Sequence, residues 1–229
     1  MKYVICFKKT GVICYTSHLD IMKVFKRSFK RAGIKLSYSQ GFNPHPKMGF
    51  AQPLSLGYEG LDEYIEFETA DDQGISSQEI LKRLRAIMPE GLELLSIDEA
   101  RHPKTLAANT VAADYVIEIP YPDGAATDSL YDAKRLWHDY MDQKEIMVLK
   151  KQKKKKEPVL VDIRPKIREI LFYPSDEGIR VEATLDSGSE SNLSPELVIT
   201  TILERFGLDI PRSEIRVIRT KIHFKECLT

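Results

Sequence analysis

Residues 15–57 read YTSHLDIMKVFKRSFKRAGIKLSYSQGFNPHPKMGFAQPLSLG, and this stretch decides how the first half of the chain folds. Ser17 is a typical helix N-cap, and the carboxylate of Asp20 favours the positive end of the helix dipole. Gly33 is a natural helix stop. Between them, apolar residues recur at helical spacing at positions 21, 25, 29 and 32. The sequence therefore predicts an amphipathic helix from about Ser17 to Ala32.

The remainder of this helix is strongly basic. Like charges four residues apart cost a few tenths of a kcal/mol per pair, and the helix contains three such pairs. A sequence that tolerates them indicates a polyanionic partner. A solvated basic face is the alternative. The basic residues are Lys23, Lys26, Arg27, Lys30 and Arg31.

The next unusual segment is polar and rich in proline, from Gln40 to Lys47. Its two prolines, at positions 44 and 46, fix φ and push Asn43 and His45 into extended geometry. The segment therefore predicts a stiff backbone from which polar side chains project. Phe42 is a candidate for stacking an unpaired base or for the core, whereas we expect Tyr38 in the core.

The elements around this stretch follow a recognisable order. Alternating patterns predict strands at 2–8, 34–38, 48–56, 62–69 and 92–97, an extended run at 12–15, and a second helix at 78–88. Strand, helix, strand, strand, helix, strand is the ferredoxin-like arrangement. We expect it to form a first domain at 1–101.

A linker at 102–112 precedes a second domain at 113–229, in which the order repeats less regularly. Strands are predicted at 114–119, 146–152, 159–163, 170–173, 179–185 and 215–224, with helices at 130–141 and 195–206. The predicted class is α+β, with two tandem ferredoxin-like halves and one or two extra strands in the second. The lysine-rich loop at 150–157 is either a hairpin tip that touches phosphate or a solvated loop.

Charge is distributed unevenly although the total is zero. Residues 1–50 carry +9, residues 51–143 carry −12 and residues 144–229 carry +3. This asymmetry favours a polyanion-facing surface, unless the acidic middle pairs with the basic start inside the fold.

Other compositional features narrow the class of protein. No apolar run reaches the roughly 18–20 residues that span a bilayer, and the N-terminus lacks a signal-peptide pattern, so we expect a cytoplasmic protein with no membrane association. Three scattered cysteines predict no disulfide framework. The sequence has no zinc-ligand or cluster-ligand spacing, so we predict no metal and no cofactor.

Clustered Lys and Arg supply the phosphate contacts that dominate nucleic-acid affinity. A second polar segment, Asp162–Arg168, could extend the basic surface, and Asp162 could pair with one of its basic side chains. His45 is the one weak catalytic candidate, with Ser17 and His18 as possible neighbours, and no nucleophile-elbow pattern supports catalysis. The predicted nucleic-acid-binding residues are Lys23, Lys26, Arg27, Lys30, Arg31, Gln40, Phe42, Asn43, His45, Lys47, Arg164, Lys166 and Arg168.

The motifs Ser17-His18-Leu19-Asp20 and Ser39-Gln40-Gly41-Phe42-Asn43-Pro44-His45-Pro46-Lys47 resemble the radical-SAM-linked family of uncharacterised bacterial domains. Asp162-Ile163-Arg164-Pro165 is a looser match, and the resemblance extends over nearly the whole chain. The resemblance implies a partner, a radical SAM protein with a cobalamin-binding-type domain. Members of the resembled family are often encoded near an E/G-type ribonuclease. The first half also resembles CRISPR repeat-processing endoribonucleases at the level of fold. The two-halved layout is similar to that of tRNA-type pseudouridine synthases, but their catalytic Arg-Thr-Asp motif has no match here.

Three hypotheses follow from the sequence. The first is an RNA-binding accessory protein, without catalytic activity of its own, that presents RNA of the tRNA or rRNA class to a radical SAM partner. The second is an RNA-processing or RNA-modifying enzyme that uses His45. The third is a protein–protein adaptor that binds no nucleic acid.

Overall fold

The computed structural model describes residues 1–70, 74–100, 104–121, 132–150, 157–175, 177–226 and 228. The chain is an α+β protein and divides into two compact units. Unit 1 consists of Met1–Val111 and Arg219–Thr229, and unit 2 consists of Ala112–Ile218. The predicted boundaries at 101 and 112 stay a prediction. Lys151–Lys156, most of the lysine-rich loop, lies outside the described residues.

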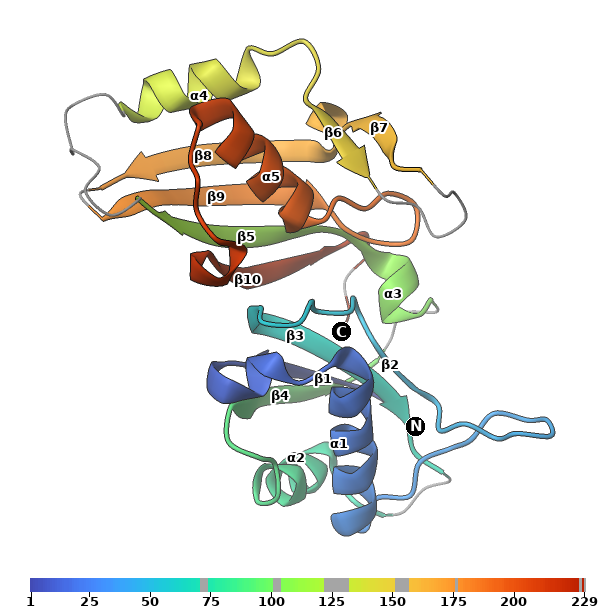
Figure 1. Cartoon of the computed structure of the whole chain (residues 1–229). Coiled ribbons are helices and arrows are strands. Elements are labelled where there is room, and N and C mark those ends of the chain that lie inside the picture. The colour runs from blue at the N-terminus through green and yellow to red at the C-terminus, as the bar shows by residue number, and fades with distance from the viewer. Residues whose placement is uncertain are drawn as a thin grey trace. The chain divides into compact units, whose positions relative to one another are not determined.

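The sheet of unit 1 is antiparallel (Figure 1). Its hydrogen-bonded order is β4-β1-β3, and β2 pairs with β3. Side chains of β1 alternate between its two faces, so that Tyr3, Ile5 and Phe7 share one face. The strands are β1 (Lys2–Lys9), β2 (Met48–Phe50), β3 (Glu59–Glu68) and β4 (Leu92–Glu99).

The two longer described helices of unit 1, α1 (His18–Arg31) and α2 (Ser77–Arg85), each begin at a serine N-cap. Ser17 Oγ accepts a hydrogen bond from the backbone N–H of Asp20 at 3.2 Å, which is the predicted N-cap. Gly33 follows the helix with φ at +73°, a conformation that glycine adopts without strain. The predicted helix over 17–32 is confirmed.

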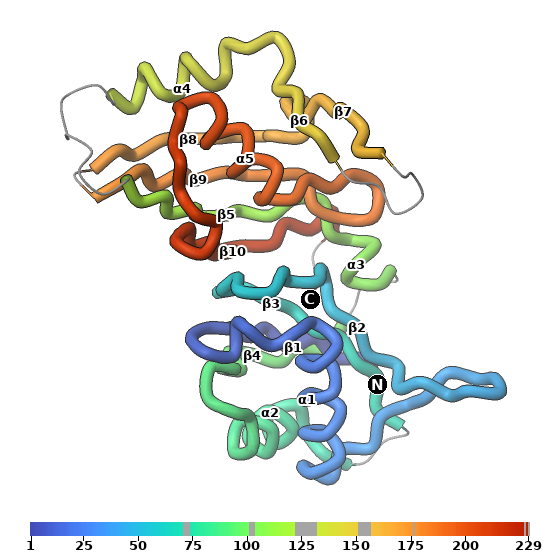
Figure 2. Tube along the Cα trace, in the orientation of Figure 1, coloured from blue at the N-terminus to red at the C-terminus, as the bar shows by residue number. Residues whose placement is uncertain are grey.

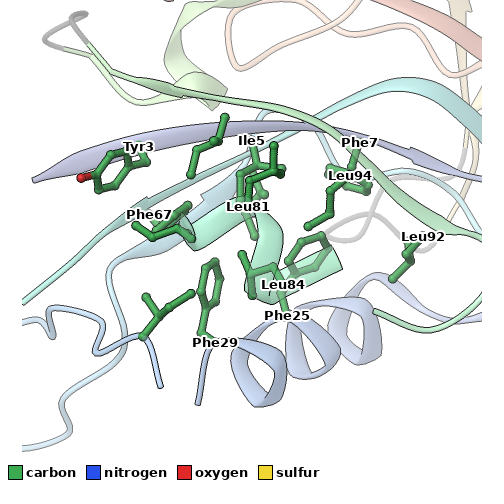
Figure 3. Close-up of a cluster of buried hydrophobic side chains, with 14 of the residues drawn as sticks. Tyr3, Ile5, Phe7, Phe25, Phe29, Phe67, Leu81, Leu84, Leu92 and Leu94 are labelled. Atoms are coloured by element: carbon green, nitrogen blue, oxygen red, sulfur yellow. The ribbon is translucent and has the colours of Figure 1, made fainter. Parts of the chain in front are cut away.

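The core of unit 1 lies between these helices and one face of the sheet (Figure 3). Phe25 and Phe29 of α1 are fully buried, and so are Phe67 of β3 and Leu84 of α2. The ring centroids of Phe29 and Phe67 are 4.5 Å apart, and Phe25 meets Phe7 edge-on at 5.1 Å. These aromatic contacts anchor α1 and leave its other face outward.

Several extended segments predicted in unit 1 are wrong or too long. Residues 12–15 form part of a 3-10 helix, η1 (Gly11–Tyr15). The ammonium group of Lys9 donates to the carbonyl of Cys14 within η1 and to that of Thr16 just after it. The predicted strand at 34–38 makes only isolated bridges. The strand predicted over 48–56 ends at Phe50, shortly before Pro53.

Residues 104–112 belong to the segment predicted as a linker. They contain a short helix, α3 (Leu106–Asn109), and the first residues of β5 (Thr110–Pro120). Leu106 and Asn109 are fully buried.

Unit 2 has strand order β5-β9-β8 and a separate pair, β6-β7. Helices α4 and α5 lie on one face of its main strands (Figure 1). Ser194 caps α5, Pro195 is its first residue and Gly207 ends it in a left-handed conformation, as predicted. The remaining elements are α4 (Ala133–Met141), β6 (Met147–Lys150), β7 (Val159–Asp162), η2 (Arg164–Lys166), β8 (Ile167–Pro174), β9 (Gly178–Asp186), α5 (Pro195–Phe206), η3 (Arg212–Glu214) and β10 (Arg216–Phe224).

Strand β10 contributes to both units, because its residues from Arg219 onward belong to unit 1. The helix predicted at 130–141 is observed from Ala133, and the residues just before position 132 are not described. No helix among the described residues is long and apolar enough to span a bilayer.

The substitution Phe25→Ala tests the core of unit 1. Removal of a fully buried aromatic ring should lower the free energy of unfolding by about 3–5 kcal/mol, measured by urea denaturation. Phe42→Ala is the matched control. Its ring is fully exposed, so the same truncation should change stability by less than about 0.5 kcal/mol. Equal losses for the two variants would contradict the assigned core.

Candidate nucleic-acid interface

The outward face of α1 is a cluster of positive charge. All five predicted basic residues of this helix are exposed, whereas Ile21, Phe25 and Phe29 are buried. Lys23 is held by Asp20, with Nζ 2.9 Å from a carboxylate oxygen. Within the part of the chain that the structure describes, the other four form no ion pair. These four residues, Lys26, Arg27, Lys30 and Arg31, are called the basic face below.

Residues 37–47 form a hairpin-like arm (Figure 2). The Ser39 N–H donates to the His45 carbonyl at 2.8 Å, and the His45 N–H donates to Ser39 Oγ at 3.0 Å. The Lys47 N–H donates to the Ser37 carbonyl at 2.8 Å. Gly41 turns the tip with φ at +130°, a value that favours glycine. Backbone hydrogen bonds and two prolines together hold the arm.

Side chains at the tip of the arm point into solvent. Phe42 has a relative exposure of 112%, so it does not belong to the core. Gln40, Asn43 and His45 are exposed as well. Tyr38 was expected in the core and is instead half exposed, because its strand is reduced to a single bridge with Pro46. The arm thus presents an aromatic ring beside several hydrogen-bonding groups.

Lys47, at the base of the arm, has an acidic neighbour. Its Nζ lies 2.7 Å from a carboxylate oxygen of Glu68. Part of its charge is therefore neutralised within the protein, unlike the charge of the basic face.

The basic residues predicted in unit 2 are largely engaged in local structure. Arg164 donates two hydrogen bonds to the carbonyl of Met141, the last residue of α4. Arg168 Nε lies 2.7 Å from a carboxylate oxygen of Asp186. Lys166 is half-buried. Among the described residues Asp162 forms no pair with a basic side chain, which the sequence had left open; its carboxylate accepts the backbone N–H groups of Ile146 and Arg164.

A second polar cluster in unit 1 was not predicted from the sequence. Glu63 and Arg219 form a bidentate ion pair, with nitrogen–oxygen distances of 2.8 and 2.5 Å, and both are buried. Arg219 also donates to the Gln52 carbonyl at 2.8 Å. Lys9 is buried beside them and donates to the carbonyls of Cys14 and Thr16 at 3.2 and 3.1 Å.

His18, the first residue of α1, lies at this polar cluster. Its ring meets Phe50 edge-on at a centroid distance of 5.1 Å. Together with Lys9, Gln52 and Glu63, it lines a cavity of about 20 Å³. Burial lowers the pKa of His18, and the charges of Lys9 and Arg219 lower it further against an opposing effect of Glu63. Neutral imidazole is therefore favoured at this position.

Ser17 has a structural role rather than the nucleophilic role considered with His18 and His45. Its hydroxyl donates to an Asp20 carboxylate oxygen at 2.7 Å and accepts from the Asp20 N–H.

The only signal for the polar cluster in the sequence is a charged residue at an inward position in each of two strands, Lys9 in β1 and Glu63 in β3.

Fold and site together define an α+β protein with an exposed basic helix, a stiff arm and a buried polar pocket. Residues 2–195 match the family described as "Uncharacterized protein conserved in bacteria (DUF2344)", and the chain belongs to this family. No curated protein matches the chain.

Two solved structures give the extent of structural similarity. A chain from the crystal structure of a Cbf5-Nop10-Gar1 complex matches with a TM-score of 0.52 and 12% sequence identity, over 98% of this chain and 50% of that chain. The protein thus spans about half the length of that chain, and the likeness concerns the fold alone. A chain from the crystal structure of an unknown protein from Galdieria sulphuraria gives a TM-score of only 0.28 at 14% identity, over 95% of this chain and 97% of that one.

The substitution Arg219→Met tests the buried ion pair. It leaves the Glu63 carboxylate buried without its partner and should lower the free energy of unfolding by about 3–5 kcal/mol in chemical denaturation. Arg216→Met, on the same strand, is the matched control. It removes an exposed pair with Glu118, which should cost less than about 1 kcal/mol. A second change, Glu63→Leu, should recover part of the loss caused by Arg219→Met.

The pKa of His18 is the second measurable property of this cluster. Titration followed by NMR should place it below the ordinary histidine value, because burial and two nearby cations disfavour the proton. Between the folded and unfolded pKa values the unfolded chain binds more protons, so the free energy of unfolding falls as pH falls through this range. A His18 pKa at or above the ordinary value would contradict the assigned environment.

Proposed function

We propose that this protein is an RNA-binding accessory that presents RNA of the tRNA or rRNA class to a radical SAM partner enzyme. The observation that carries the proposal is the basic face, four exposed cations on one helix without an ion-pair partner among the described residues. Cations of this kind release counterions when they meet a phosphate backbone, and this release drives binding without reading sequence.

The arm supports the same proposal in a different way. An exposed aromatic ring stacks on an unpaired base, and neighbouring amide or imidazole groups hydrogen-bond with the base edge. Phe42 is the ring, and Asn43 and His45 supply such groups beside it. Because the backbone of the arm is held by prolines and by hydrogen bonds to Ser39, these groups are ordered before binding.

The ferredoxin-like assignment and the partner belong to this proposal. The antiparallel order β4-β1-β3, with β2 beside β3 and two helices on one face, supports a ferredoxin-like fold for unit 1, and we extend it to an elaborated version in unit 2. The resemblance of Ser17–Asp20 and Ser39–Lys47 to radical-SAM-linked domains supports a radical SAM partner with a cobalamin-binding-type domain.

The test is a titration of RNA with the triple variant Lys26→Gln, Arg27→Gln and Lys30→Gln. Each lost phosphate contact should reduce the slope of log K against log salt by about 0.7, so affinity for a single-stranded oligoribonucleotide should fall on the order of 100-fold at 0.1 M salt. Fluorescence anisotropy at several salt concentrations provides both quantities. Phe42→Ala should weaken binding by about 1–3 kcal/mol without changing the slope.

The matched control replaces Lys82, Lys134 and Lys144 by Gln. It makes the same change in net charge at three exposed lysines outside the proposed surface, and affinity should change little. If wild-type protein binds no RNA at low salt but retains a radical SAM protein after nuclease treatment, the adaptor hypothesis replaces this proposal. If wild-type protein cleaves or modifies RNA and the His45→Ala variant does not, the enzymatic hypothesis replaces this proposal.

A further inference from the structure

The polar cluster of unit 1 contains one more buried positive charge than negative charge. Lys9, Glu63 and Arg219 have relative exposures of 3%, 3% and 1%. Both oxygens of the Glu63 carboxylate are bound by Arg219, so these two charges satisfy each other. Lys9 is left as the cation without a matching carboxylate.

The hydrogen bonding of Lys9 is also incomplete. A lysine ammonium carries three N–H donors, and those of Lys9 meet two acceptors, the carbonyls of Cys14 and Thr16. Carbonyl oxygens stabilise the ammonium by their dipoles but do not neutralise its charge. Burial of a charge in this state is costly, and an anion at the third donor would relieve the cost.

Lys9 lines the small cavity, and so does His18. The other lining residues comprise the polar side chains of Gln52 and Glu63 and an apolar wall from Phe7, Ile21, Phe50 and Leu54. The volume of about 20 Å³ admits one oxygen-sized atom. A ligand that fits must therefore insert a single oxygen and keep the rest of its body outside.

We propose that this cavity is an oxyanion pocket that receives one oxygen of a phosphoryl group, with Lys9 as the charged donor and His18 as a second lining group. A tetrahedral phosphoryl group presents one oxygen ahead of the others, which suits a cavity of this size. Its negative charge balances the excess charge of Lys9. His18 gains a proton more readily once the anion is bound, which adds a second positive charge beside the ligand.

The pocket goes beyond the RNA surface proposed above. None of its lining residues belongs to the basic face or to the arm, so either proposal can fail without the other. The phosphoryl group has two possible sources, free phosphate or the terminal phosphate of a polynucleotide, and the chemistry of recognition is the same for both.

The experiment follows the His18 imidazole resonances by NMR while inorganic phosphate is added, with sodium chloride at matched ionic strength as the reference. We expect a saturable upward shift of the His18 pKa by about one unit, since an added negative charge within a few ångströms favours imidazolium. No saturable effect beyond that of chloride would overturn the proposal and leave the cavity as a site for water. An equal effect from acetate would overturn the phosphoryl assignment.

Two variants assign the effect to Lys9. Lys9→Met should abolish the saturable shift, whereas Lys8→Met, the same change at the exposed neighbour paired with Glu93, should retain it. A shift that persists in Lys9→Met would overturn the role of Lys9. The titration of wild-type protein tests the proposal by itself, even if the Lys9→Met variant fails to fold.

A pair of oligoribonucleotides, with and without a 5′-phosphate, separates the two sources. If the phosphorylated oligonucleotide shifts His18 at a lower concentration than inorganic phosphate does, while its unphosphorylated counterpart does not, the ligand is a terminal phosphate. If only inorganic phosphate acts, the ligand is the free anion.

Discussion

Unit 1 depends on a long-range interaction, the buried ion pair between Glu63 and Arg219. It joins two residues 156 positions apart, and its Arg219 belongs to the C-terminal part of the chain that lies in unit 1. Both groups lose their water, so neither tolerates removal of the other. Gly60 is constrained by the same pair, because a Cβ atom there would clash with a Glu63 oxygen that Arg219 holds in place.

The exposed surface rests on this buried chemistry. Both carboxylate oxygens of Glu63 are bound by Arg219. The ammonium group of Lys9 donates instead to backbone carbonyls in η1 and just after it. The chain leaves η1 at Thr16 and enters α1 through the Ser17 cap. These contacts position the start of α1. Because Phe25 and Phe29 lie in the core, the basic face on the other side of the helix is exposed to solvent.

Local signals account for what could be predicted from the sequence. A cap, a helical period and a glycine stop lie within 17 residues of one another, so α1 was predictable, and prolines fix the backbone of the arm without tertiary help. The polar pocket was not predictable, because its members come from distant segments and a charged residue in a strand is normally taken to face solvent. The sequence likewise does not reveal the partners of Arg164 and Arg168. Arg164 donates to a carbonyl at the end of α4, and Arg168 pairs with Asp186.

Salt screens the exposed cations of α1 and the buried charge of Lys9 to different extents. Exposed cations on α1 act across water, where the Debye length is about 8 Å at physiological ionic strength, so their attraction is weak in selectivity and is largely screened beyond that distance. Lys9 is buried and lines the cavity, so a ligand must place an atom in the cavity to feel most of its charge. Under the two proposals, the helix would attract polyanions in general, while selection would depend on the arm and on a group that can place one oxygen next to Lys9.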